Sequence, residues 1–412
     1  MGGFDVISVD RLLWALFLLV LKDPWSDFRY VTKATTRTTS KTPESSEMPT
    51  GLPAVNTSGA INEQVALSQQ SVYSRSSNPT RSSTIEQEYP ATIWERLPWV
   101  GTLLISIRLN NWMINSPSHD RTQPPVPAFR SRKAFIAYTL LCFTRGYLIL
   151  DLTRAYISYD PYFTNLALPI NTPLPFDALH FVPPQLVRTM IVGAQAWALI
   201  GQMFYLPCLL PVGLHALGYL PDEWAPHLWP AYYGPPGVIF KHGIRGFWGQ
   251  YWHQTMRWSV SAPGYAIADA LRLPSRSMVR YAIITTVAFE LSGITHTGLV
   301  PPEPLYATVS VNHIRLCIAG FFWVQAVGIL LETFAAHCLV ALGGLQFWQS
   351  GAGMRVRQAV NGVWVVAWFA LTLPLLAEFA RQLGYWRVWP VPISVWNGLT
   401  TGQWATWSVL QS

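Results

Sequence analysis

Two histidines in aromatic or apolar surroundings are the residues of this sequence best suited to chemistry. His253 lies in the run RGFWGQYWHQTMRW (residues 245–258), and His296 lies in AFELSGITHTGLV (residues 288–300). Because desolvation disfavours the charged form of an imidazole, a buried histidine tends to stay neutral. A neutral imidazole can take a proton from an alcohol, so both residues are candidate general bases.

Small residues precede both histidines by about one helical turn. In a helix, Gly249 would lie one turn before His253, and Ser292 and Gly293 would lie one turn before His296. We therefore expect each imidazole to border a hollow that can hold a substrate. A helix over residues 246–258 would also align on one stripe Trp248, Trp252 and Met256.

Charged residues accompany both runs. Glu290 lies in the same apolar stretch as His296, and ionisable residues inside a membrane usually face a cavity or a partner. A collar of basic residues flanks the first run and could hold an anionic cofactor, although an ordinary cytosolic loop of a membrane protein carries the same excess of positive charge. The collar comprises Lys241, His242, Arg245, Arg257, Arg272, Arg276 and Arg280.

Several chemistries are excluded by missing motifs. The sequence has no HxxH or HExxH cluster, no Gly-rich phosphate loop ending in GK, and no GxSxG nucleophile elbow. Its four cysteines lie in apolar segments without a CxxC pair, which favours core packing over a zinc site or a disulfide framework. The net charge of +7 comes with no nucleic-acid motif. Metal-free acid and base chemistry remains.

The composition indicates a membrane protein. Of 412 residues, 50 % are hydrophobic and only 12 % are charged, whereas soluble domains carry about 25 % charged residues. We expect an all-α polytopic fold with about seven to nine transmembrane helices, each of roughly 20 residues. The best candidates are residues 135–152, 186–206, 208–220, 278–300, 316–345 and 360–379, and the weakest are 12–21 and 391–410.

Changes in composition divide the chain into three parts. Residues 1–31 are predicted to form an uncleaved N-terminal anchor segment. Residues 32–92 are rich in Ser and Thr and poor in aromatics, which predicts a disordered insertion. Residues 93–412 are the expected multi-pass domain, with the motif core at 222–300.

Basic residues also predict the topology. FRSRK (residues 129–133) precedes the span that starts near Phe135, so that end should be cytosolic and the Pro-rich stretch 160–184 should be lumenal. Residues 186–220 could form one span broken at Pro207 and Pro211, or two short spans. A single span would return the chain, and with it the first histidine run, to the cytosolic face.

Both histidine runs resemble signatures of one family. RGFWGQYWHQTMR is similar to the F-W-G-x-x-W-H-Q signature of wax synthase-like acyltransferases, within the membrane-bound O-acyltransferase superfamily, and FELSGITH is similar to their F-x-x-S-G-x-x-H signature. DEWAPHLWPAYYGPP and SRKAFIAYTLLCFTRGYLILDL resemble upstream parts of the family, so the likeness extends from about Trp94 to Leu345. Within the family, the chain looks most like fungal members that acetylate terpenoid or meroterpenoid alcohols.

The resemblance implies roles for individual residues. His296 matches the histidine that the superfamily uses as its base, and His253, with Gln254 nearby, would orient the carbonyl or stabilise the oxyanion. Gln250 departs from the commonest form of the signature, where the family often has arginine. The expected binding residues are Arg245, Trp248, Gly249, Trp252, Gln254, Arg257, Glu290, Ser292 and Gly293.

The implied activity is direct acyl transfer, with acetyl-CoA as co-substrate, no permanent cofactor and a lipophilic terpenoid alcohol as acceptor, in the endoplasmic reticulum membrane. One alternative is a wax ester synthase with long-chain donors. Another is a transporter whose histidines line a path, although the two halves of the chain show no convincing symmetry. A membrane terpene cyclase, with Glu290 and Asp151 as acids, is a third.

Overall fold

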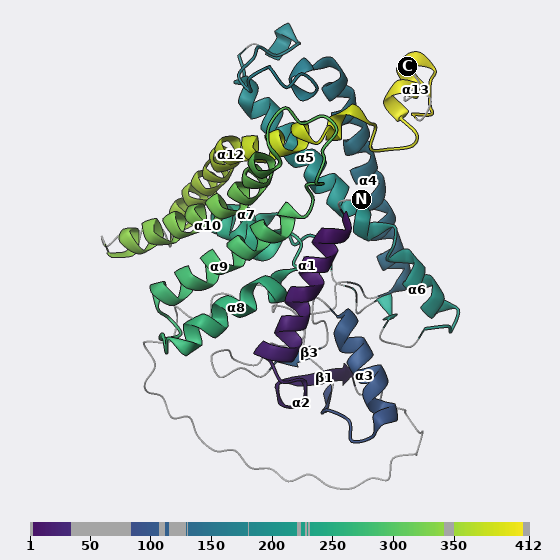
Figure 1. Cartoon of the computed structure of the whole chain (residues 1–412), viewed down its shortest axis with the longest axis vertical. Coiled ribbons are helices and arrows are strands. Elements are labelled where there is room, and N and C mark those ends of the chain that lie inside the picture. Colours follow the sequence, from purple (N-terminus) through teal and green to yellow (C-terminus); the bar gives the residue numbers. More distant parts are fainter. Residues whose placement is uncertain are drawn as a thin grey trace, which may run out of the picture.

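A computed structural model describes residues 3–33, 84–106, 112–114, 129, 131–179, 181–220, 224–226, 229, 231–341 and 350–406, and most of them are helical (Figure 1). The α-helices are α1 (Gly3–Leu16), α2 (Pro24–Asp27), α3 (Ile93–Ile105), α4 (Arg132–Tyr159), α5 (Pro184–Tyr205), α6 (Leu209–Ala216), α7 (Gly237–Gly246), α8 (Arg257–Ala270), α9 (Met278–Thr297), α10 (Val311–Ala341), α12 (Gly351–Gln382) and α13 (Val395–Thr401). Among the described residues, η1 (Phe17–Leu21) and η6 (Phe247–Tyr251) are π-helical, and η2 (Pro161–Phe163), η3 (Asp177–Leu179) and η7 (Tyr385–Arg387) are short 3₁₀ turns.

Four helical segments of the described chain are long and apolar enough to cross a membrane. They are Arg132–Tyr159, Pro184–Ala216, Val311–Leu339 and Gly351–Gln382. The membrane character predicted from composition is therefore supported, but the expected seven to nine spans are not confirmed. The predicted C-terminal span is wrong over its described part, because α13 has only 7 residues, and a helix of that length rises about 10 Å.

Residues 186–220 form one long helix followed by a short one. α5 ends at Tyr205, and α6 is a separate helix of 8 residues, too short to cross a bilayer. α4 and α5 pack side by side along the molecule (Figure 1). This region therefore has one candidate span, which brings the chain back to the end of the molecule at which α4 begins.

A small sheet departs from the all-α prediction. Strands β1 (Phe28–Lys33), β2 (Thr84–Gln87) and β3 (Trp112–Ile114) form an antiparallel sheet in the order β2-β1-β3. β2 belongs to the stretch 32–92 that was predicted to be disordered, so its last residues are ordered by pairing with β1. The central part of that stretch, 34–83, lies outside the described residues.

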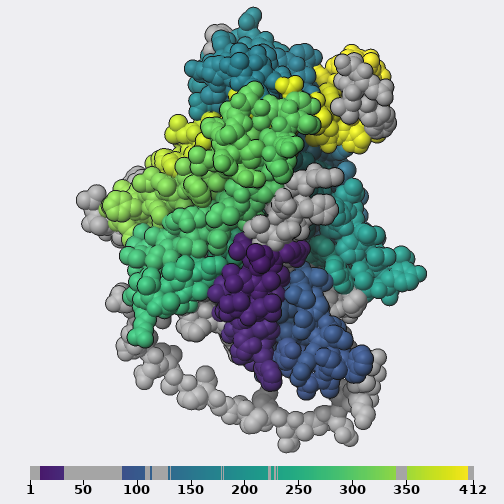
Figure 2. All heavy atoms as spheres, viewed as in Figure 1, coloured from purple at the N-terminus to yellow at the C-terminus, as the bar shows by residue number. Residues whose placement is uncertain are grey.

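Aromatic packing joins this N-terminal region to the helices. Trp99 and Trp112 are buried and meet edge to face at 4.7 Å between ring centroids. Phe17 stacks on Trp258 of α8 at 6.3 Å, and the segment α1–η1 lies against α8 and α9 (Figure 2). The predicted N-terminal anchor segment therefore packs on the helix that directly follows the first histidine run.

A buried ion pair fixes the loop between α4 and α5. Arg188 donates to both carboxylate oxygens of Asp160, at 2.9 and 2.8 Å, and both side chains are fully buried. Arg188 also donates to the carbonyls of Ile170 and Thr172 at 2.6 and 2.7 Å. Its guanidinium lies over the Tyr162 ring at 4.6 Å. The loop is thereby held on α5 by groups whose hydrogen bonds offset their desolvation.

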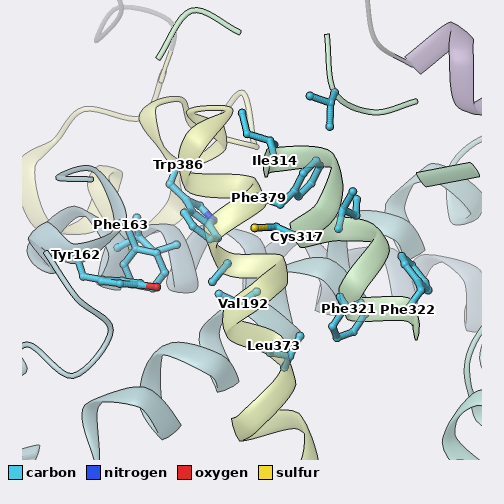
Figure 3. Packing of buried hydrophobic residues seen from close by; sticks show 14 residues of the cluster. Tyr162, Phe163, Val192, Ile314, Cys317, Phe321, Phe322, Leu373, Phe379 and Trp386 are labelled. Carbon is cyan, nitrogen blue, oxygen red and sulfur yellow. The ribbon is translucent and has the colours of Figure 1, made fainter. Parts of the chain in front are cut away.

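The main apolar core lies between α5, α10 and α12. Phe321 and Phe322 extend from α10 in different directions, and Leu373 and Phe379 of α12 pack near Val192 of α5 (Figure 3). Because Phe321 and Phe322 are consecutive residues of a helix, their side chains point in different directions. α10 can therefore pack on this core with one face and on α9 with the adjacent face.

Removing Arg188 should destabilise the fold strongly. In Arg188→Ala the Asp160 carboxylate stays buried without its partner, which costs about 3–5 kcal/mol in the free energy of unfolding. Arg188→Lys keeps the positive charge but cannot bond both carboxylate oxygens in the same geometry. Its free energy of unfolding should therefore lie between those of the wild type and Arg188→Ala. Thermal unfolding of the detergent-solubilised proteins measures the loss of stability. The control is Arg132→Ala, at the exposed start of α4. Equal melting temperatures for Arg188→Ala and the control would contradict the assignment.

Candidate active site

The first histidine run is not one helix. α7 is kinked at Gly243, the π-helix η6 follows, and the helix ends at Trp252, which is extended with φ −63° and ψ 154°. α8 then begins at Arg257. The predicted stripe of Trp248, Trp252 and Met256 is therefore wrong, because the chain leaves the helix before His253.

Gln254 holds the turn that carries His253. Its Nε2 donates to the carbonyls of Trp248 and Trp252 at 3.0 and 2.7 Å, and its Oε1 accepts from Arg257 at 3.3 Å. Both amide hydrogens are used by these bonds. In this arrangement Gln254 positions His253 and has no hydrogen left to donate to an oxyanion.

Aromatic rings hold the His253 imidazole. It stacks on Tyr232 with ring centroids 5.6 Å apart and planes 13° apart, and it contacts Trp252 at 5.4 Å. The neighbouring Tyr233 packs on Trp252 at 5.5 Å, and the Gly234 amide donates to the Tyr251 carbonyl at 2.8 Å. The tyrosine pair was not predicted as part of the site, although its position in the upstream family-like stretch was a usable signal.

Gly249 faces open space. A Cβ added to it would meet no atom within 4 Å, and the residue is exposed. The glycine leaves space on this side of the first run, but the helical turn that was expected to place it beside the His253 imidazole is not formed.

His296 is held near the end of α9 by a backbone carbonyl. Its Nδ1 lies 2.7 Å from the Ser292 oxygen, which can only accept a hydrogen bond. Nδ1 therefore carries the hydrogen, and in the neutral imidazole Nε2 is the free basic nitrogen. The ring lies against Phe322 of α10, with centroids 4.2 Å apart. His296 thus has one basic nitrogen, Nε2, in a ring that packs against an apolar side chain.

The small residues before His296 serve other purposes than the predicted hollow. A Cβ on Gly293 would lie 3.1 Å from the Ala319 carbonyl and from Trp323 Nε1, so this glycine lets α9 and α10 approach closely. Ser292 acts through its carbonyl.

The two acidic candidates are also placed away from the imidazoles. Glu290 is exposed, and six residues of helix place it about 120° around α9 from His296. Asp151 is buried and accepts from the Trp396 amide at 2.9 Å, where it fastens α13 to α4. Neither carboxylate is positioned as the acid that a cyclase would need.

Trp248 brings the two runs together. Its ring contacts Phe289 of α9 at 5.6 Å, and Phe322 of α10 at 6.2 Å. Phe322 in turn contacts His296, while Trp252 links Trp248 to the His253 side at 5.7 Å. The predicted residues from both runs thus share one aromatic cluster.

A buried amide fixes Trp248 in that cluster. Gln325 of α10 is fully buried, and its Oε1 accepts from Trp248 Nε1 and from Trp368 Nε1, both at 3.2 Å. Its Nε2 donates to the Phe321 carbonyl and to Thr372 Oγ1, both at 3.1 Å. Sequence reasoning missed Gln325, although a glutamine within the apolar run 316–345 was a visible signal.

The basic collar is reorganised in the structure. Arg280 is buried and bonds to Asp269 at 2.6 Å, so it does not belong to an open basic surface. Arg245 and Arg257 are exposed. The pKa of His242 is lowered by burial first, and then by repulsion from Arg245, Arg357 and Lys241. Arg357 of α12, which was not predicted, thus joins this basic cluster of Lys241, His242, Arg245 and Arg357.

The two glycines should respond differently to alanine. Gly293→Ala forces a methyl group against α10 and should lower the free energy of unfolding by about 1–3 kcal/mol. Gly249→Ala fills open space, so its melting temperature should match wild type while its acyl-transfer rate falls because the methyl group narrows the space for a substrate. Melting curves and turnover of the purified proteins distinguish the two effects. Wild-type turnover in Gly249→Ala would show that no substrate uses this side.

The region that carries both histidine runs resembles known proteins. Residues 229–301 match the Membrane bound O-acyl transferase family, a range that includes both histidines. The chain is 26 % identical over 318 residues to Acetyltransferase eriL of Hericium erinaceus, covering 76 % of this chain and 74 % of the relative. It is 25 % identical over 261 residues to Acetyltransferase ataH of Aspergillus terreus, covering 60 % and 77 %.

A shorter match reaches Acetyltransferase TRI7 of Fusarium sporotrichioides, with 27 % identity over 180 residues, or 41 % of this chain and 38 % of the relative. No solved structure matches the chain significantly. The family match and the relatives confirm the resemblance seen in the two signatures. The chain thus resembles the membrane bound O-acyl transferase family over its motif region and is similar to fungal acetyltransferases, and these matches identify it as an O-acyltransferase enzyme.

Proposed function

We propose that the enzyme transfers an acetyl group from acetyl-CoA to a hydroxyl of a lipophilic terpenoid or meroterpenoid. The observation that carries this proposal is the His296 imidazole, whose Nδ1 hydrogen is directed to the Ser292 carbonyl so that Nε2 is basic. The relatives named above are all acetyltransferases, which supports the acetyl group.

In the proposed reaction, His296 Nε2 takes the proton of the acceptor hydroxyl as its oxygen attacks the thioester carbonyl. The new C–O bond forms, the C–S bond breaks, and the proton passes to the departing thiolate to give an ester and free CoA. The transfer is direct, without an acyl-enzyme, because the acceptor oxygen itself attacks the thioester. Holding both substrates together supplies much of the acceleration.

His253 is the proposed partner of the thioester oxygen. It is fixed by Tyr232 and by the turn that Gln254 closes. A group held this way needs little reorganisation when negative charge develops, which is the condition for efficient oxyanion stabilisation. Gln254 would support this role by positioning His253.

The basic cluster of Lys241, His242, Arg245 and Arg357 is the proposed contact for the phosphates of CoA, since cations next to an apolar site suit a donor with an anionic head. The acceptor would arrive from the bilayer, because four candidate spans place the enzyme in a membrane. We further propose that this membrane is the endoplasmic reticulum, from which microsomes can be prepared for assay.

Replacing His296 tests the base. His296→Gln should lower the rate of acetyl transfer by about 10²–10⁴-fold, measured as label passing from acetyl-CoA into terpenoid and fatty alcohols by microsomes. His337→Gln is the matched control, because His337 also bonds a carbonyl four residues earlier, Thr333 at 2.9 Å, but lies exposed on α10. Transfer at the wild-type rate in His296→Gln would refute the mechanism.

Phe322 should limit the length of the acyl chain. Its ring occupies the space next to His296 and Trp248, so Phe322→Ala should raise the kcat/KM for butanoyl-CoA relative to acetyl-CoA by about tenfold, the usual effect of one or two methylenes in an apolar site. Phe379→Ala, which removes a buried ring near Tyr385, serves as the control. Unchanged selectivity in Phe322→Ala, or an equal change in the control, would contradict the assignment.

A further inference from the structure

A carboxylate on α10 is bonded to the start of the first motif. α7 is broken at Gly243, which has φ 61° and ψ −140°. Glu332 reaches this break, where one oxygen accepts from the Ile244 amide at 3.1 Å and the other accepts from the Arg245 amide at 3.0 Å. A Cβ on residue 243 would collide with the same carboxylate. Only glycine therefore permits both the backbone turn and the approach of Glu332.

The contact satisfies backbone groups that a helix leaves open. The helical stretch that begins after Gly243 has no preceding turn to accept its first amide hydrogens. A carboxylate at this position makes charge-assisted hydrogen bonds and lies at the positive end of the new helix. Glu332 lies within the candidate span Val311–Leu339, where an ionisable residue is costly and needs such partners.

Glu332 shares one face of α10 with two residues that hold the site. Phe322, Gln325 and Glu332 are spaced by three and then seven residues, so they project from the same side of a helix. Phe322 contacts His296, Gln325 bonds Trp248, and Glu332 bonds the amides that precede Trp248. The first motif is thus attached to α10 at two points, and the second motif at a third.

We propose that Glu332 is a positioning residue for acyl transfer, which sets the first motif relative to His296. It touches neither the reacting atoms nor a substrate. Its carboxylate fixes where the stretch Ile244–Tyr251 begins, and therefore where Trp248 and the turn of His253 lie. The inference rests on the proposed function, since one of its readouts is acetyl transfer.

The test uses the full-length enzyme in detergent with two substitutions at the contact. Glu332→Gln keeps the shape of the side chain but replaces one acceptor oxygen with a donor, so one amide loses its partner. Gly243→Ala displaces the carboxylate by steric collision. Each should lower kcat by about 10–100-fold, the usual effect of losing a group that orients a catalytic residue, with the KM for acetyl-CoA changed less than threefold. Hydrogen exchange of the 244–251 amides should become faster in both.

The double variant and a control complete the design. Because both substitutions break one contact, the double variant should be no slower than Gly243→Ala. Glu378→Gln is the matched control, since Glu378 bonds Arg381 and Gln382 near the C-terminal end of α12, and it should leave kcat and exchange at 244–251 unchanged. A wild-type kcat in Glu332→Gln, or unaltered exchange at 244–251, would overturn the proposal. Hydrogen exchange of the 244–251 amides does not require turnover. If the wild type transferred no acetyl group, the proposed function would be refuted, but the exchange result would still decide whether Glu332 positions the first motif.

Discussion

The amide of Gln325 makes four hydrogen bonds inside the protein, which is the full capacity of its oxygen and its two hydrogens. Its orientation is therefore fixed by chemistry, because the two indole partners can only donate. Through them Gln325 joins α10 to the first motif at Trp248 and to α12 at Trp368. In a low-dielectric interior, losing this amide would leave two indole N–H groups unsatisfied, at about 1–3 kcal/mol each. Together with the Glu332 contact, these bonds set one alignment for helices that otherwise pack mainly through apolar side chains.

The aromatic rings around this amide depend on that alignment. Apolar contacts are weakly directional, so packing between Trp248, Phe322 and Phe289 alone would allow α10 to slide or rotate against its neighbours. The Gln325 bonds remove that freedom, and Gly293 allows the close approach that brings the Phe322 ring within 4.2 Å of His296. Polar bonds set the position of the helices, and aromatic contacts then shape the site.

The sequence predicted the two histidines and their aromatic and small neighbours, because these residue types stand out in short apolar runs. It also predicted that the protein is helical and membrane-bound. It did not predict Glu332, Gln325 or Phe322, since they lie on another helix and their relation to the motifs exists only after folding. The break at Gly243 and the exit at Trp252 also escaped prediction, because helical periodicity assumes an unbroken helix. The sheet around β1 was hidden by strand segments of three to six residues, too short for a periodic signal.

The kink at Gly243 lies where the chain passes from one environment to another. Lys241 and His242 of the basic cluster precede it, Arg245 of the same cluster follows at once, and Trp248 then lies in the aromatic cluster. The donor proposed above, with a phosphate-bearing head and an acyl thioester, would need these two environments in the same order. Water and cations suit the phosphates, while a dry surface strengthens the electrostatic stabilisation of the thioester oxygen. If α7 were unbroken, the chain would keep one helix axis and would not turn from the basic cluster toward the aromatic cluster. The break at Gly243, held by the Glu332 hydrogen bonds, lets one short segment contribute residues to both clusters. This contribution is a physical reason for a carboxylate inside a candidate span.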